Sequence, residues 1–190
     1  GGHRTQADSA VVCLGPWSRT FLKRVGMRVP MACERGYHMH YRGPAEGGNA
    51  PLRRPIYDPK GGYVLSPMDQ GLRLTTGVEL TRRDAPKNTL QLERAERAAR
   101  EAIGLGERLE DTPWLGSRPT LPDSRPAIGQ APGRRGLYLA FGHQHVGFST
   151  GPGTARLLAD IMEDKPPVIP KAPFDPSRFI TQKNQALQES

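Results

Sequence analysis

Two segments toward the C-terminal end carry the residue types best suited to binding a flat or charged ligand. Residues 138–151 have the sequence YLAFGHQHVGFSTG, an apolar strand leading into a loop of glycine and histidine, and a helix is predicted to start at Pro152. A helix start offers unpaired backbone N–H groups and a partial positive charge, and glycines let a ligand approach that backbone closely. Residues 114–129 hold Arg118 in a stiff Pro/Gly setting. Together the two segments predict one wall of a cofactor pocket with a fixed cation beside it.

Size and composition allow one domain or two small ones. The chain has 190 residues, and its 22 glycines and 19 prolines indicate a loop-rich protein that contains a sheet. The net charge of +8 comes from scattered residues, without a recognition helix or a ladder of aromatic and basic side chains. We therefore expect no specific nucleic-acid binding.

The two cysteines and the apolar runs exclude several further classes of protein. Cys13 and Cys33 lack CxxC spacing, so we expect neither a disulfide scaffold nor a metal site, and Cys13 is predicted to be a small buried thiol. No apolar run approaches the ~20 residues of a membrane span. The N-terminus has neither an initiator Met nor a signal-peptide core, as if an upstream part were absent.

Patterns along the first half predict strands. Residues 8–18 form an apolar run that suits a parallel sheet covered on both faces. Between about Val29 and Leu80, short alternating runs separated by turns predict an antiparallel sheet. Within residues 36–41, the alternation places Tyr37, Met39 and Tyr41 on one face and His38 and His40 on the other.

One helix is clear from its pattern. Residues 88–103 have Leu92, Ala95, Ala99 and Ala102 at helical spacing, and Gly104 follows. Asn88 and Gln91 have the spacing of a capping box. We expect this helix to serve packing alone. The proline-rich tail from Lys165 onward is expected to wrap along the surface in an extended form.

Several blocks of the chain follow, in order and spacing, the blocks of one known family. They are ADSAVVCLGPWS at 7–18, VPMACERGYH at 29–38, GLRLTTGVEL at 71–80, the Arg118–Pro119 pair, PDSRPAIG at 122–129 and LYLAFGHQHVG at 137–147. The chain resembles the C-terminal portion of the flavin-dependent amine and D-amino-acid oxidoreductases. That family includes D-amino-acid oxidases, glycine and sarcosine oxidases, and bacterial D-amino-acid dehydrogenases. The Tyr37–His38 pair and residues 142–149 look most like the last branch.

The resemblance implies an α+β fold derived from an α/β one. It combines an antiparallel-sheet substrate domain with the C-terminal strand and helix of a Rossmann-like FAD-binding domain. The implied segments are 1–20 for the last strand segment of the FAD-binding domain, 21–111 for the substrate domain, 112–164 for the closing FAD segment and 165–190 for the tail. The family's N-terminal βαβ unit with GxGxxG is missing. We therefore expect a fragment or subunit that needs an N-terminal FAD-binding segment or a partner subunit.

The resemblance also implies how FAD would be held. Backbone N–H groups along the loop would lie against the isoalloxazine ring and stabilise negative charge at its N1–C2=O edge. Gly15 would let the end of the first strand pass close to the flavin. The loop residues in this role are Gly142, His143, Gln144, His145, Val146, Gly147, Phe148 and Ser149. A purely structural, hydrogen-bonded role for His143 is an equal alternative.

Substrate contacts are implied in the same way. Arg118 stands where the family keeps an arginine that grips the substrate carboxylate through two parallel hydrogen bonds. His145 falls where some relatives carry a basic side chain near the flavin. Tyr37 or His38 would roof the substrate from the sheet, with Tyr63 as a weaker candidate. Each of these three is equally interpretable as an ordinary sheet residue.

The implied activity is FAD-dependent oxidative deamination of an amino acid, with a D-amino acid favoured by the branch. A hydride would pass from the substrate Cα to flavin N5, and no dedicated general base is needed if the amine arrives neutral. Oxygen, a quinone or another protein would accept the electrons. We expect a cytoplasmic location, with peripheral attachment to the inner face of a bacterial membrane as an alternative. A non-catalytic remnant or accessory subunit is the alternative function.

Overall fold

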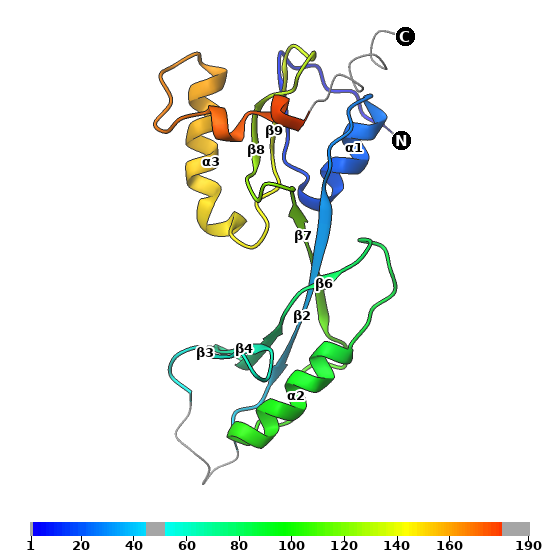
Figure 1. Ribbon diagram of the computed structural model, residues 1–190, viewed down its shortest axis with the longest axis vertical. Coiled ribbons are helices and arrows are strands. Elements are labelled where there is room, and N and C mark those ends of the chain that lie inside the picture. Colours follow the sequence, from blue (N-terminus) through cyan, green and yellow to red (C-terminus); the bar gives the residue numbers. More distant parts are fainter. Residues whose placement is uncertain (1, 45–51, 180–190) are drawn as a thin grey trace. The chain divides into compact units, whose positions relative to one another are not determined.

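The computed structural model describes residues 2–44 and 52–179, which divide into two compact units (Figure 1). The sheet unit comprises residues 34–117, and the flanking unit comprises the described residues up to Cys33 and from Arg118 onward. The boundaries fall inside two strands rather than in loops. The segments 1–20, 21–111, 112–164 and 165–190 remain predictions as functional domains.

The sheet unit is built on the antiparallel sheet that the alternating runs predict. Its strand order is β3-β4-β5-β2-β6, and β7 also pairs with β2. The strands are β2 (Ala32–Tyr41), β3 (Ile56–Asp58), β4 (Tyr63–Met68), β5 (Gly71–Thr76), β6 (Glu79–Leu80) and β7 (Trp114–Thr120). The turn between β4 and β5 ends at Gly71, whose φ is +145° and whose added Cβ would lie 2.3 Å from the carbonyl oxygen of Tyr41. Only glycine fits this junction.

Helix α2 (Leu90–Ile103) covers one face of this sheet. Its Leu92, Ala95 and Ala99 are buried against a core that includes Tyr37 and Leu74. The predicted start at residue 88 is two residues early. Asn88 Oδ1 accepts the N–H of Leu90 at 3.1 Å, but Gln91 donates to the carbonyl of Val78 instead of closing a capping box. Gly104 ends the helix with a φ of +65°, as predicted.

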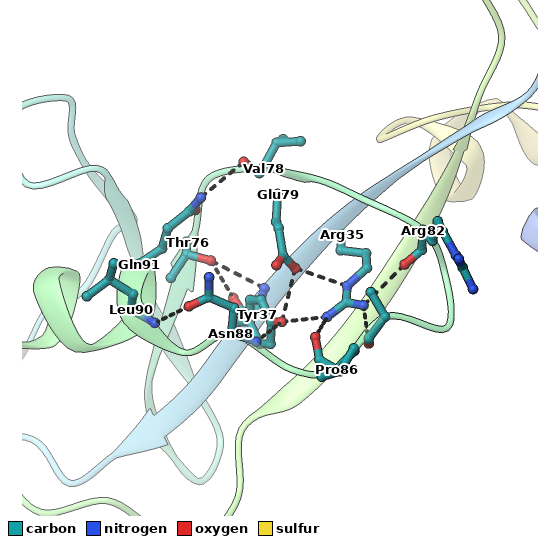
Figure 2. A network of polar contacts seen from close by, with 11 residues as sticks. Arg35, Tyr37, Thr76, Val78, Glu79, Arg82, Pro86, Asn88, Leu90 and Gln91 are labelled. Carbon is teal, nitrogen blue, oxygen red and sulfur yellow. Dashed lines mark hydrogen bonds and ion pairs between the residues drawn. The ribbon is translucent and has the colours of Figure 1, made fainter.

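A buried arginine ties the first half of β2 to the segment before α2 (Figure 2). Arg35 is fully buried, and its Nε lies 3.0 Å from Glu79 Oε2. Its remaining nitrogens donate to the Tyr37 hydroxyl and to backbone carbonyls at 82, 85 and 86. The Tyr37 hydroxyl in turn donates to Glu79 and accepts the N–H of Asn88. Burying a guanidinium is costly unless it is paired in this way.

The flanking unit holds a three-stranded sheet in the order β1-β9-β8. Strand β1 (Ala10–Val12) pairs in parallel with β9 (Leu137–Phe141), and β8 (Ala127–Gln130) pairs with β9 in the antiparallel sense. Helix α1 (Ser18–Arg24) follows the 3-10 turn η1 (Gly15–Trp17), and helix α3 (Gly147–Met162) packs on β8 (Figure 1). The parallel pairing of the first strand is thus confirmed.

Two expectations for this unit are wrong. Cys13 is exposed, because β1 is an edge strand of the described sheet and Val12 is its only buried residue. Helix α3 begins at Gly147, five residues before Pro152, because the hydroxyls of Ser149 and Thr150 bond the carbonyl of Val146 and support a helical first turn.

The described part of the tail packs on the flanking unit, but it is not extended throughout as expected. It forms two 3-10 turns, η2 (Ala172–Phe174) and η3 (Pro176–Phe179), that contact β8. Arg178 fastens it by donating to both Asp123 and the carbonyls at 125 and 126. Residues 180–190 lie outside the described part.

Within residues 2–44 and 52–179, no helix has both the length and the apolar character that crossing a bilayer requires.

Candidate functional site

The Gly/His loop lies directly beside the strand that carries Arg118. Thr120 forms an antiparallel bridge with His143, and the N–H of Gln144 donates to the carbonyl of Pro119 at 3.1 Å. These contacts join segments more than twenty residues apart. They place Arg118, two residues before Thr120 on β7, on a strand fixed to the loop. Arg118 is half-buried, and its Nη1 is shielded from solvent.

Gly142 gives the loop its sharp entry from β9. Its φ is +91°, and a Cβ at this position would lie 2.6 Å from Cδ1 of Leu121. The loop then turns again at Gln144, whose φ is +51°. Two residues with positive φ within three positions direct the chain from the strand into α3.

Gly142→Ala is expected to lower the free energy of unfolding by about 1–3 kcal/mol, because alanine meets both an unfavourable φ and the Leu121 side chain. Urea denaturation of both proteins measures this loss. Gly151→Ala is the control, since it lies inside α3 with open space around it and should be neutral or mildly stabilising. Equal losses in the two variants would contradict the strain at Gly142.

The start of α3 is open to a ligand. Its N-cap residue, Val146, makes no side-chain hydrogen bond to the helix, and the first turn holds no acidic side chain. Phe148 is 100% exposed and Ser149 is exposed as well. The N–H groups of residues 147–149 have no partner within the helix, by the geometry of any helix start. An acceptor atom placed here would meet several donors and the positive end of the helix dipole.

The two histidines of the loop have different surroundings. His143 lies half-buried against α3, with Nε2 2.8 Å from the Thr154 hydroxyl, and burial lowers the pKa of its imidazole. This position fits the structural alternative for His143. His145 is exposed at the loop surface. Gly15 is half-buried with a φ of +50°, and open space surrounds the position of its missing side chain.

The three substrate-contact candidates of the sheet unit, Tyr37, His38 and Tyr63, do not lie on the same face of the sheet. Tyr37 and Tyr63 are buried in the core on the α2 side, and their hydroxyls bond Glu79 and Asp58. Their positions favour the interpretation as structural residues. His38 points to the opposite face and stacks on Trp114, with ring centroids 4.6 Å apart and planes 16° from parallel.

Polar side chains surround His38 on this opposite face, called here the open face. His40 lies edge-on to His38, and its Nδ1 lies 2.5 Å from Glu110 Oε1. Its Nε2 accepts the Nε–H of Arg73 at 3.0 Å, so Nδ1 carries the proton that bonds Glu110. Burial lowers the pKa of His38, and the charge of Arg73 acts in the same direction. His38 is therefore a neutral imidazole near pH 7.

The open face holds a depression that individual sequence patterns did not predict. It has a volume of about 590 Å³ and is lined by His38, Lys87, Glu110, Thr112, Pro113, Trp114 and Leu115. Gly116 makes room for it, because a Cβ there would lie 2.2 Å from the Trp114 ring. The WxG spacing of Trp114 and Gly116 ahead of Arg118 is the signal that marks this aromatic wall in the sequence.

Acid should weaken the Glu110 contact with His40. Partial burial by itself raises the pKa of Glu110, but hydrogen bonds from the N–H and ring of His40 outweigh it and hold that pKa below the usual value. The stabilisation is therefore present above the unfolded pKa of about 4.3 and lost as pH falls through the folded pKa. Glu110→Gln should destabilise the protein at pH 7, and the difference from wild type should shrink below about pH 4.3.

Thermal unfolding between pH 3 and 7 measures this convergence. Glu107→Gln is the control, since its side chain is exposed three residues away on the same segment. A difference in Tm between wild type and Glu110→Gln that stays constant over this range would show that ionisation of Glu110 does not stabilise the fold.

Among the described residues, no group of three or more His, Cys, Asp or Glu side chains is placed to hold a metal ion.

The chain matches one family of known proteins over most of its length. A family model described as DAO, FAD dependent oxidoreductase, matches residues 1–161. The chain is 36% identical over 180 residues to a D-amino-acid oxidase of Bradyrhizobium diazoefficiens, covering 91% of this chain and 41% of that protein. It is 30% identical over 173 residues to a glycine oxidase of Pseudomonas aeruginosa, covering 90% of this chain and 46% of the relative. The chain thus spans less than half the length of these two relatives.

Solved structures give the same assignment of the fold. Glycine oxidase from Geobacillus kaustophilus matches with a TM-score of 0.74 and 27% identity, over 92% of this chain and 46% of that one. Iminodiacetate oxidase from Chelativorans sp. BNC1 matches with a TM-score of 0.74 and 23% identity, over 92% and 47%. The second match shows the fold alone.

Proposed function

Because this chain belongs to the family of FAD-dependent oxidoreductases, we propose that it forms the substrate-binding and flavin-closing part of an amino-acid oxidase or dehydrogenase. One observation carries the proposal most directly. The bridge between Thr120 and His143 brings the strand of Arg118 beside the loop that opens α3. A carboxylate-binding cation and a row of backbone donors are thereby provided by neighbouring segments.

The residues at the loop fit the flavin end of FAD. The uncapped start of α3 supplies N–H donors and a positive dipole end, which suit an oxygen or nitrogen acceptor that gains negative charge on reduction. The open space at Gly15 allows a flat ring to approach the backbone there. When bound, FAD supplies the hydride acceptor for the oxidation of the substrate Cα.

Arg118 binds and orients the substrate in this proposal. Its guanidinium holds the carboxylate by paired, charge-assisted hydrogen bonds and so fixes which face of Cα is presented. The half-buried position strengthens this attraction by excluding water. His145, exposed on the same loop, contacts the substrate or the flavin edge. His143 keeps the loop against α3 through Thr154.

His38 is the substrate contact that we propose from the sheet unit. Its ring lies on the open face, whereas Tyr37 and Tyr63 lie on the face that α2 covers. A neutral imidazole can accept one hydrogen bond and donate another, which suits the amine of an amino acid. The substrate loses a hydride from Cα and a proton from nitrogen to give an imino acid. Water then converts the imino acid to a keto acid and ammonia.

The remaining contacts to FAD come, in this proposal, from polypeptide beyond these 190 residues, either an N-terminal segment or a partner subunit. Edge strand β1 supports this, because Val11, Leu14 and Trp17 are exposed on and beside it. Exposed apolar side chains at an unpaired strand edge suit a further strand and its cover.

The test joins this chain to the complementary FAD-binding polypeptide, either fused or co-expressed. A flavin absorption spectrum and turnover of D-amino acids with a dye acceptor are the expected results. Glycine and L-amino acids, assayed in parallel, report the substrate preference. A flavin-loaded protein that turns over no amine would contradict the catalytic proposal and favour the alternative of a non-catalytic accessory subunit.

A further inference from the structure

A second candidate site lies on the flanking unit, away from the Gly/His loop in sequence. It is a depression of about 290 Å³ lined by Arg19, Lys23, Met27, Arg28 and Val29, and is called here the basic depression. Three of its five lining residues are cations, and none is acidic. The stretch between Asp8 and Glu34 contains no acidic residue at all, although it contains four Lys or Arg residues.

The local fold collects these cations from two directions. Arg19 and Lys23 are four residues apart and so share one face of α1. Gly26, with a φ of +81°, then reverses the chain, and the N–H of Met27 bonds the carbonyl of Leu22 at 2.9 Å. This helix-ending turn brings Arg28 back toward the same depression.

The arrangement has an electrostatic cost that no acidic side chain among the described residues offsets. Like charges at i and i+4 destabilise a helix, and none of the ion pairs formed by described residues includes Arg19, Lys23 or Arg28. Arg19 is held in place, because its Nη1 donates to the carbonyl of Met31 at 3.1 Å. The other nitrogens of its guanidinium remain available to a ligand.

We propose that the basic depression binds a phosphate-bearing anion. Three cations around one small volume match a group with two or more negative charges better than a single carboxylate. The apolar side chains of Met27 and Val29 are buried in its lining, so the charged groups surround an apolar base. A recess of this size suits a phosphate or pyrophosphate group, whereas a nucleic-acid surface needs an extended basic stripe.

The first test titrates the full chain with pyrophosphate and with inorganic phosphate, followed by ³¹P NMR. Saturable binding is expected, and Lys23→Gln with Arg28→Gln should weaken it at least tenfold. The matched control is Arg24→Gln with Arg94→Gln, which removes the same charge from exposed positions outside the depression. It should leave the affinity within twofold. Unchanged circular dichroism and Tm verify that both double variants are folded.

Two further arms identify the source of the phosphate. In the first, the protein is sedimented with phosphatidylglycerol vesicles and, as a control, with phosphatidylcholine vesicles. A lipid headgroup is indicated if the protein binds only the phosphatidylglycerol vesicles, if pyrophosphate competes with this binding, and if the Lys23→Gln/Arg28→Gln variant fails to bind. Saturable pyrophosphate binding without vesicle binding would indicate a free phosphate compound. Both outcomes support the proposal, and neither requires that the chain take part in flavin chemistry.

Several results would overturn it. Equal losses in the two double variants would mean that net charge alone attracts the anion. The absence of saturable binding at millimolar pyrophosphate, or binding only to oligonucleotides, would also exclude a phosphate site. If FAD displaces pyrophosphate and its own binding is lost in the Lys23/Arg28 variant, the depression belongs to the cofactor site and is not a separate one.

Discussion

Glu79→Ala should lower the free energy of unfolding of the sheet unit by about 3–5 kcal/mol, because it leaves the fully buried guanidinium of Arg35 without its counter-ion. The same change removes the acceptor of the Tyr37 hydroxyl. Chemical denaturation followed by circular dichroism measures the effect. The segment from residue 82 to Asn88 should also become accessible to hydrogen exchange, since Arg35 and Tyr37 hold it (Figure 2).

Two comparison variants define the cause of this loss. Glu79→Gln keeps an acceptor oxygen but removes the charge, so its loss should lie between those of wild type and Glu79→Ala. Asp84→Ala breaks an ion pair with Arg83 in which the Asp84 side chain is exposed, and no measurable loss is expected. If Glu79→Ala behaves like Asp84→Ala, the network of Arg35 contributes nothing to the stability of this unit.

Arg118→Ala should raise KM for the amino acid in the assembled flavoenzyme at least roughly 30-fold. This corresponds to a loss of about 2–5 kcal/mol of binding free energy. The physical reason is that, in the proposed site, the variant loses the half-buried cation that pairs with the substrate carboxylate. Steady-state kinetics on a D-amino acid give the value, and the corresponding amine without a carboxylate should show no such dependence. The flavin spectrum verifies that the variant still binds the cofactor.

Arg118→Lys separates charge from geometry. A lysine keeps the positive charge but loses the paired donors of the guanidinium, so an intermediate KM is expected. Arg125→Ala removes an exposed arginine seven residues further along the chain and is expected to leave KM unchanged. A KM for Arg118→Ala equal to that of wild type would remove Arg118 from the substrate site and leave the loop as a cofactor contact only.

The proposed roles of the two units predict separable kinetic effects. Changes at Arg118 act on carboxylate binding, whereas His38 faces the depression with Trp114 and Glu110 on the other unit. His38→Asn should change the pH profile of kcat/KM more than the affinity for the carboxylate, because it replaces a titratable ring with a neutral amide. A pH profile identical to wild type would assign His38 a structural role.

Local patterns in the sequence determined much of the fold. The alternation of residues 36–41 correctly separates Tyr37, Met39 and Tyr41 from His38, because successive side chains of any strand point to opposite faces. The spacing of Leu92, Ala95 and Ala99 predicts the buried face of α2 for a similar reason. The order and spacing of the motif blocks predicted the family, since the resemblance depends on residue types and spacing alone.

Only the tertiary structure decided which distant segments meet. No local pattern joins Thr120 to His143, Trp114 to His38, or Glu110 to His40, because these contacts depend on strand pairing and loop paths. Burial is equally non-local. Cys13 lies in an apolar run and is nevertheless exposed, because β1 is at the edge of the described sheet. The sequence by itself therefore determined the chemistry available to the protein, and long-range pairing decided which side chains can act together.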